Sequence, residues 1–170
     1  MLTETLERIR EDNICTGMVF GMFDVWHPGY ITLLDDLASH CDFIIAGLQT
    51  TRQNDRPMKS GPAFGIVERQ MMLLANENVD DVIVYERDGE IEQILRWVQP
   101  EVRILGSDYN LSPADPVDLP DFENIIGGEE LHEELDIAIV FHDRGRIWSA
   151  TDARKRIKVL TIQEDIDGQE

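Results

Sequence analysis

The stretch Gly17-Met-Val-Phe-Gly-Met-Phe-Asp24, followed by Val25-Trp-His-Pro-Gly-Tyr30, decides the fold of this chain. Its first part is almost entirely apolar, which predicts a buried strand. Pro28 and Gly29 then suit a tight entry into a helix over 29–40, where apolar residues recur at helical spacing. A buried strand that leads directly into a helix is typical of the first unit of a parallel α/β sheet.

Strands and helices continue to alternate along the chain. We predict further buried strands at 42–48, 82–85, 102–105 and 137–141. We predict helices at 2–12, 64–77, 90–98 and 151–160. The helix over 64–77 is expected to point four residues inward, namely Ile66, Met71, Leu73 and Leu74. The predicted fold class is α/β, a single-domain Rossmann-like parallel five-stranded sheet with helices on both faces.

Ligands of such a sheet bind beyond the carboxyl ends of its strands, where the strand order switches. The sequence has no internal repeat or second-domain boundary, so we expect one domain over 1–170 with its core at 17–158. The segment 110–134 is acidic and rich in Pro and Gly, which predicts an insertion or long loop with room for one helical turn. Residues 50–62 are polar and basic and predict a loop.

The charge of the chain limits its partners. The 170 residues carry a net charge of −19, with an isoelectric point near 4.4. This disfavours nucleic-acid binding, which needs a basic face, but it allows a small anionic substrate in a local basic pocket. No apolar run approaches the roughly 20 residues that span a bilayer, and the N-terminus is charged and amphipathic. We therefore expect a cytoplasmic protein without a membrane partner.

Neither the cysteines nor the histidines are spaced as metal ligands. Cys15 and Cys41 lie far apart in the sequence, so we expect two reduced thiols rather than a disulfide. The four histidines are scattered, which argues against a zinc site.

Two predicted helix starts have the composition of an anion site. In the turn from Gly21 to Tyr30, free backbone N–H groups, the helix dipole and His27 suit a phosphate. The stretch from Arg144 to Arg154 places arginines and the hydroxyls of a helix cap at the start of the last helix. The alternatives are an ordinary loop with a polar histidine, and a capped helix with arginines on its solvated face. The occurrence of both at one sheet edge favours phosphate binding.

The order of these motifs resembles the cytidylyltransferase-like nucleotidyltransferases, the HxGH superfamily. The family pattern GTFDxxHxGH corresponds to Gly21-Met-Phe-Asp-Val-Trp-His-Pro-Gly-Tyr30, and its RxxG[IY]S[ST]Txx[RK] pattern to Arg144-Gly-Arg-Ile-Trp-Ser-Ala-Thr-Asp-Ala-Arg154. Further collinear matches lie between them, at Arg56-Pro57 with Arg69, at Asn78–Val84 and at Pro100–Tyr109. The resemblance covers about residues 17–158, and it is strongest to glycerol-3-phosphate cytidylyltransferase and the nucleotidyltransferase domain of ADP-heptose synthase.

The resemblance implies transfer of a nucleotidyl group from a nucleoside triphosphate to a phosphorylated alcohol or sugar, with release of pyrophosphate. A CMP group is expected first, and an ADP-heptose-synthase-like adenylyl transfer is the alternative. Magnesium would arrive with the triphosphate and needs no protein ligand. A homodimer is a family-level expectation.

The resemblance also assigns roles to individual residues. Those expected to be catalytic are His27, Tyr30, Lys59 and Arg154. Those expected to bind the nucleotide are Met22, Phe23, Asp24, Gly29, Asp108, Arg144, Ser149 and Thr151. Arg56 and Arg69 are expected to bind substrate, with Arg56 an alternative to Lys59 for the phosphates.

Three positions depart from the family pattern. Tyr30 replaces the second histidine, Met22 replaces a threonine, and Ala150 replaces a residue with a hydroxyl. Tyrosine can donate a hydrogen bond but is neutral at pH 7. Two interpretations follow: an altered but working enzyme, or a nucleotide-binding homologue without turnover.

Overall fold

Five parallel strands form the single sheet of the protein, in the order β3-β2-β1-β4-β5. The computed structural model describes residues 2–51, 61–106, 128–143, 148, 150–151 and 153–158. The strands are β1 (Thr16–Gly21), β2 (Phe43–Gln49), β3 (Asp81–Tyr85), β4 (Val102–Gly106) and β5 (Ala138–His142). The chain winds outward from β1 to β3 and then crosses to β4, so the strand order switches between β1 and β4. The predicted fold class is confirmed.

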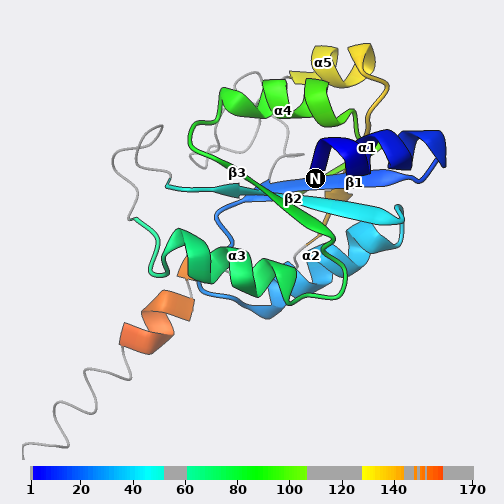
Figure 1. The fold of residues 1–170 in the computed structure, drawn as a ribbon. Coiled ribbons are helices and arrows are strands. Elements are labelled where there is room, and N and C mark those ends of the chain that lie inside the picture. Colours follow the sequence, from blue (N-terminus) through cyan, green and yellow to red (C-terminus); the bar gives the residue numbers. More distant parts are fainter. Residues whose placement is uncertain are drawn as a thin grey trace, which may run out of the picture.

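Helices cover both faces of the sheet (Figure 1). One face carries α2 (Pro28–Ala38) and α3 (Ile66–Leu74), and the other carries α1 (Leu2–Glu11), α4 (Glu90–Val98) and α5 (Gly128–Glu134). Further helical residues lie at 150–151 and 153–158. No helix in these described ranges is both long and apolar enough to span a membrane.

The side chains of β1 point alternately into two separate hydrophobic cores. Val19 is buried among the residues of α2 and the neighbouring strands, including Leu34. Met18 faces the opposite way and is buried with Ile91 and Leu95 of α4. Because both faces of the strand are buried, its sequence is almost continuously apolar, which is the pattern that made it predictable.

The predicted elements are present, with shifts at their ends. β1 stops at Gly21 rather than at Asp24, because Phe23 and Val25 adopt left-handed backbone conformations with φ of 45° and 49°. These two residues make the turn that leads into α2.

The predicted orientation of α3 is wrong at two positions. Met71 and Leu74 are 66% and 49% exposed, whereas Leu73 and Arg69 are buried. Ile66 packs at the edge of the core. The helix has apolar residues on two sides. The hydrogen bonds of Arg69, described below, turn the side that carries Arg69 and Leu73 toward the sheet.

The C-terminal part of the predicted acidic insertion is a packed helix. Residues 110–127 lie outside the described ranges, but Leu131 and His132 of α5 are buried against the sheet. His132 Nδ1 donates to the Gly128 carbonyl at 2.7 Å, and its Nε2 accepts from Arg103 of β4 at 3.0 Å. The guanidinium of Arg103 also lies 5.1 Å from the centre of the Phe20 ring. These bonds require a neutral imidazole with its proton on Nδ1.

This arrangement predicts a loss of stability in acid. Burial, together with the charge of Arg103, lowers the pKa of His132. As the pH falls below about 6.5, the unfolded chain takes up a proton on this residue before the folded protein does, so the free energy of unfolding decreases. In His132→Gln this part of the pH dependence should disappear, as measured by urea unfolding between pH 7.5 and 5. The exposed-residue variant His40→Gln is the control, and an unchanged pH slope in His132→Gln would contradict the assignment.

Candidate functional site

The turn after β1 is held by the buried carboxylate of Asp24, which is 1% exposed. It accepts hydrogen bonds from the backbone N–H groups of Ala63 and Phe64, each at 2.9 Å, and forms an ion pair with Arg154. Three segments therefore meet at one side chain: the β1–α2 turn, the approach to α3 and the last helix. A buried carboxylate needs such partners, because an unpaired charge in the interior is costly.

Arg69 fixes the same corner of the sheet from α3. Its guanidinium donates to the carbonyl oxygens of Met22 at 2.8 Å, and of Gln49 and Thr50 at 2.7 Å each. Its Nε donates to the Phe64 carbonyl at 3.0 Å. The side chain is 1% exposed, and burial lowers its pKa. This geometry gives Arg69 a structural role, the joining of the β1 and β2 ends, and its expected substrate-binding role stays a prediction.

His27 occupies the N-cap position of α2, with an extended backbone, and is 8% exposed. Its ring stacks on Tyr30 with 4.1 Å between the centroids. Tyr30 also contacts Phe23 and Trp26, at 5.1 and 5.6 Å between ring centroids. The residue that replaces the second histidine of the motif is thus one of four packed rings.

Gly29 allows this packing. A Cβ at this position would lie 3.0 Å from His27 Nδ1 and 3.4 Å from the Cβ of Trp148. A side chain here would therefore press on the imidazole, so the motif needs glycine for close approach rather than for an unusual backbone angle.

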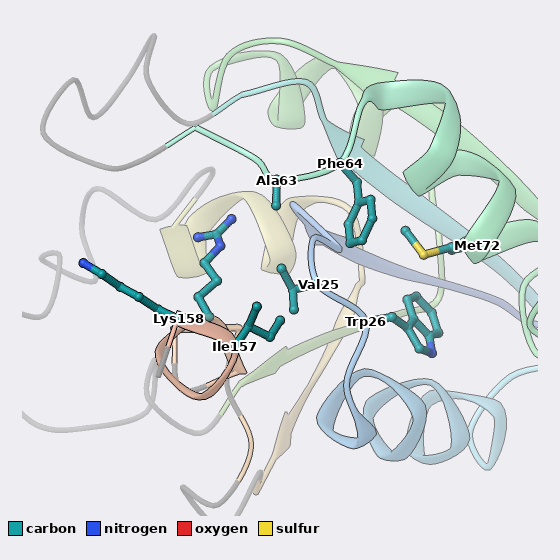
Figure 2. A pocket seen from close by; sticks show the side chains of 8 residues that line it. Val25, Trp26, Ala63, Phe64, Met72, Ile157 and Lys158 are labelled. Carbon is teal, nitrogen blue, oxygen red and sulfur yellow. The ribbon is translucent and has the colours of Figure 1, made fainter. Parts of the chain in front are cut away.

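A cavity of about 420 Å³ opens next to Val25, which follows Asp24, and Arg154, which pairs with it (Figure 2). Its walls come from the β1–α2 turn, the approach to α3, α3 itself and the last helix, and they consist of Val25, Trp26, Ala63, Phe64, Met72, Arg154, Ile157 and Lys158. Most of these side chains are apolar, and the two polar ones are cationic. Sequence reasoning singled out only Arg154 among them, because four separate segments contribute one to three residues each.

The structure brings together most of the described residues that the sequence singled out. Met22, Phe23, Asp24, His27, Gly29 and Tyr30 form the β1–α2 turn and the start of α2, and the ion pair joins them to Arg154. Thr151 lies one turn before Arg154 and is exposed. The predicted residues Arg56, Lys59, Asp108, Arg144 and Ser149 lie outside the described ranges.

No three His, Cys, Asp or Glu side chains converge on a possible metal position within the described part of the chain. Both cysteines are free thiols, and burial raises the pKa of Cys41 to about 12. Such a thiol is a poor nucleophile at neutral pH.

The structural role of Arg69 predicts the effect of a conservative substitution. Arg69→Lys retains the charge but cannot reproduce four hydrogen bonds to four carbonyl groups, so the free energy of unfolding should fall by about 2–3 kcal/mol. Chemical denaturation measures this, with the exposed-residue variant Arg87→Lys as control. Wild-type stability in Arg69→Lys, combined with a loss of ligand affinity, would instead favour a role of Arg69 in substrate binding.

Comparisons with known proteins agree with this geometry. The sequence model of the cytidylyltransferase-like family matches residues 18–156. The chain is 31% identical over 156 residues to the bifunctional protein HldE of Nitrobacter hamburgensis, a match that covers 91% of this chain and 29% of that protein. It is 34% identical to HldE of Nitrobacter winogradskyi over 65% of this chain and 22% of that protein. The chain thus spans less than a third of the length of these curated relatives.

Solved structures support the fold. The lipopolysaccharide core biosynthesis protein from Thermoplasma volcanium matches with a TM-score of 0.54 and 21% identity, over 76% of this chain and 95% of that one. Pantoate-beta-alanine ligase from Francisella tularensis matches with a TM-score of 0.52 and 15% identity, over 92% of this chain and 75% of that one. From the family match, the HldE relatives and the shared architecture, we conclude that the chain belongs to the cytidylyltransferase-like family of nucleotidyltransferase domains.

Proposed function

We propose that this protein transfers a nucleotidyl group from a nucleoside triphosphate to a phosphorylated small molecule and releases pyrophosphate. The observation that carries the proposal is the contact between Asp24 and Arg154. These residues belong to the two motifs proposed to bind phosphate and lie 130 positions apart, and their contact brings the β1–α2 turn and the last helix together at one corner of the carboxyl edge of the sheet. A triphosphate bound there would face two helix starts at once.

The reaction needs no covalent intermediate with the enzyme. A phosphate oxygen of the acceptor attacks the α-phosphorus in line with the departing pyrophosphate, so one P–O bond forms as another breaks. Magnesium bound to the triphosphate would neutralise part of its charge. The contribution of the protein is to position the reactants and to stabilise the charge that develops on the transferred phosphate. His27 is the candidate donor to that phosphate, and Arg154 is a candidate cation for the triphosphate.

The relatives favour ATP over CTP as the nucleotide. The HldE matches cover most of the chain and support an adenylyl transfer like that of ADP-heptose synthase. The acceptor would occupy the cavity, with its carbon skeleton on Trp26 and Phe64 and its phosphate toward Arg154 and Lys158. Six further residues keep their proposed roles in phosphate or nucleotide binding, namely Lys59, Arg56, Asp108, Arg144, Ser149 and Thr151.

Nucleotide binding without turnover is the second candidate function, and the position of Tyr30 favours it. The family places a histidine here, whereas Tyr30 is neutral at pH 7 and stacks on His27 within an aromatic cluster. In oxyanion sites, the loss of one hydrogen-bond donor reduces the rate by about 10²–10³. The replacement of a histidine by Tyr30 removes one charged donor in the same way.

The first experiment is an assay of pyrophosphate release with Mg²⁺, in which ATP and CTP are each combined with a panel of phosphorylated alcohols and sugars. His27→Ala should reduce kcat by about 10²–10³ and change the nucleotide Kd little, because its bond forms in the transition state. Equal losses of kcat and affinity in His27→Ala would contradict a role of His27 in transition-state stabilisation.

Arg154→Ala should weaken nucleotide binding, measured by calorimetry, whereas Arg156→Ala on the same helix should not.

Tyr30→His distinguishes the two candidate functions. The substitution restores the family motif, so it should preserve or raise the rate of pyrophosphate release if the site keeps the family geometry. Tyr30→Phe is the matched control, since it keeps the stacked ring and removes only the hydroxyl. A clear loss of activity in Tyr30→His would show that the site is rebuilt around the tyrosine. No release in any of these proteins, with retained nucleotide binding, would favour the binding protein.

A further inference from the structure

His142, the last residue of β5, lies between two side chains of α2. Its Nδ1 is 2.6 Å from Asp36 Oδ2, and its Nε2 is 3.3 Å from Thr32 Oγ1. Thr32 and Asp36 are four residues apart, so they share one face of α2 and hold the imidazole between them. The histidine is 8% exposed. Both ring nitrogens thus contact α2 residues that lie 106 and 110 positions earlier in the chain.

The hydrogen bonds continue from Thr32 to the motif around His27. Asp36 accepts the proton on Nδ1, and the Thr32 hydroxyl lies 3.4 Å from the carbonyl oxygen of Gly29. The neutral ring would accept from this hydroxyl at Nε2, whereas the charged ring would donate to it and leave the hydroxyl proton for Gly29. With the charged ring, the Thr32 hydroxyl bonds both His142 and the Gly29 carbonyl, and so connects β5 to the first turn of α2. With the neutral ring, the bond to His142 remains and Thr32 Oγ1 only contacts the Gly29 carbonyl.

Gly29 transmits this connection to the proposed phosphate site. Its Cα lies so close to His27 that an added Cβ would be 3.0 Å from Nδ1 of the imidazole. The same added Cβ would be 3.4 Å from Trp148, which follows β5. The first turn of α2 is therefore packed between His27 and Trp148.

We propose that His142 is a positioning residue of the nucleotidyl transfer. With Asp36 and Thr32, it fixes the His27 turn relative to the end of β5, and hence relative to the segment that carries the second phosphate motif. This inference rests on the proposed function, in which one triphosphate contacts both motifs. Small errors in such spacing are costly, because a displacement of about 1 Å can reduce a rate roughly 10²-fold.

The hydroxyl of Thr32 provides the sharpest test. Thr32→Val keeps the branched shape and removes the hydroxyl, and it should lower kcat about 10- to 100-fold with little change in the KM of the nucleotide. Thr32→Ser restores the hydroxyl and should recover most of kcat. His142→Gln places an amide near the position of Nε2 and should retain more activity than His142→Asn, whose amide mimics Nδ1 only.

A control on the same carboxylate comes from His40, which is exposed and lies 3.6 Å from the other oxygen of Asp36. His40→Gln should keep kcat within about twofold, because it leaves the connection to Gly29 intact. Equal kcat in wild type and Thr32→Val would overturn the proposal. Equal losses in Thr32→Val and Thr32→Ser, in parallel with their melting temperatures, would also overturn it.

A second measurement separates this proposal from the proposed function. In the full chain without nucleotide, the imidazole NMR signals of His27 should shift in Thr32→Val and return in Thr32→Ser, while those of His132 stay unchanged as an internal reference. If the wild type shows no pyrophosphate release, the proposed function fails, but these signals still report whether Thr32 positions His27. Unshifted His27 signals in Thr32→Val would overturn the positioning role.

Discussion

The carboxylate of Asp24 is the point on which the rest of the site depends. It is buried at the end of β1 and satisfied by two backbone N–H groups and one guanidinium. Because a buried charge must be paired, the turn after β1, the approach to α3 and the last helix cannot separate without a large energetic cost. One side chain thereby defines the corner of the sheet where the strand order switches and where ligands of this fold bind.

Arg69 is a charged residue near the site whose hydrogen bonds all go to the backbone of the protein itself. It is as buried as Asp24, and backbone carbonyls accept hydrogen bonds from four of its N–H groups. Arg154 differs, because it lines the cavity and also pairs with Asp24. Burial and saturation of hydrogen bonds therefore separate the arginine that builds the site from the one that can meet a ligand.

One departure from the family motif, Tyr30, lies directly against the retained histidine. Tyr30 stacks on His27, and Phe23 and Trp26 surround Tyr30. Aromatic packing excludes water and strengthens the electrostatic contacts that remain, but it also supplies fewer charged donors to a developing negative charge. Under the proposed function, the balance between these two effects would decide whether the site turns a nucleotide over or only holds it.

The sequence by itself determined the elements and their order. Continuous apolar runs specify buried strands such as β1, and Pro28 marks the start of α2, because these signals are local in the chain. Through the family motifs, the sequence also selected His27, Asp24 and Arg154 for the site. It did not reveal their partners, and it misplaced Met71 and Leu74 on α3.

Only the tertiary structure decided which residues meet. The Asp24–Arg154 pair, the four carbonyls on Arg69 and the contact of His142 with α2 each join residues far apart in the sequence or on different elements. The physical reason is that hydrophobic periodicity encodes which face of an element is buried. The partner across that face follows from the strand order and the crossovers, which no local pattern contains.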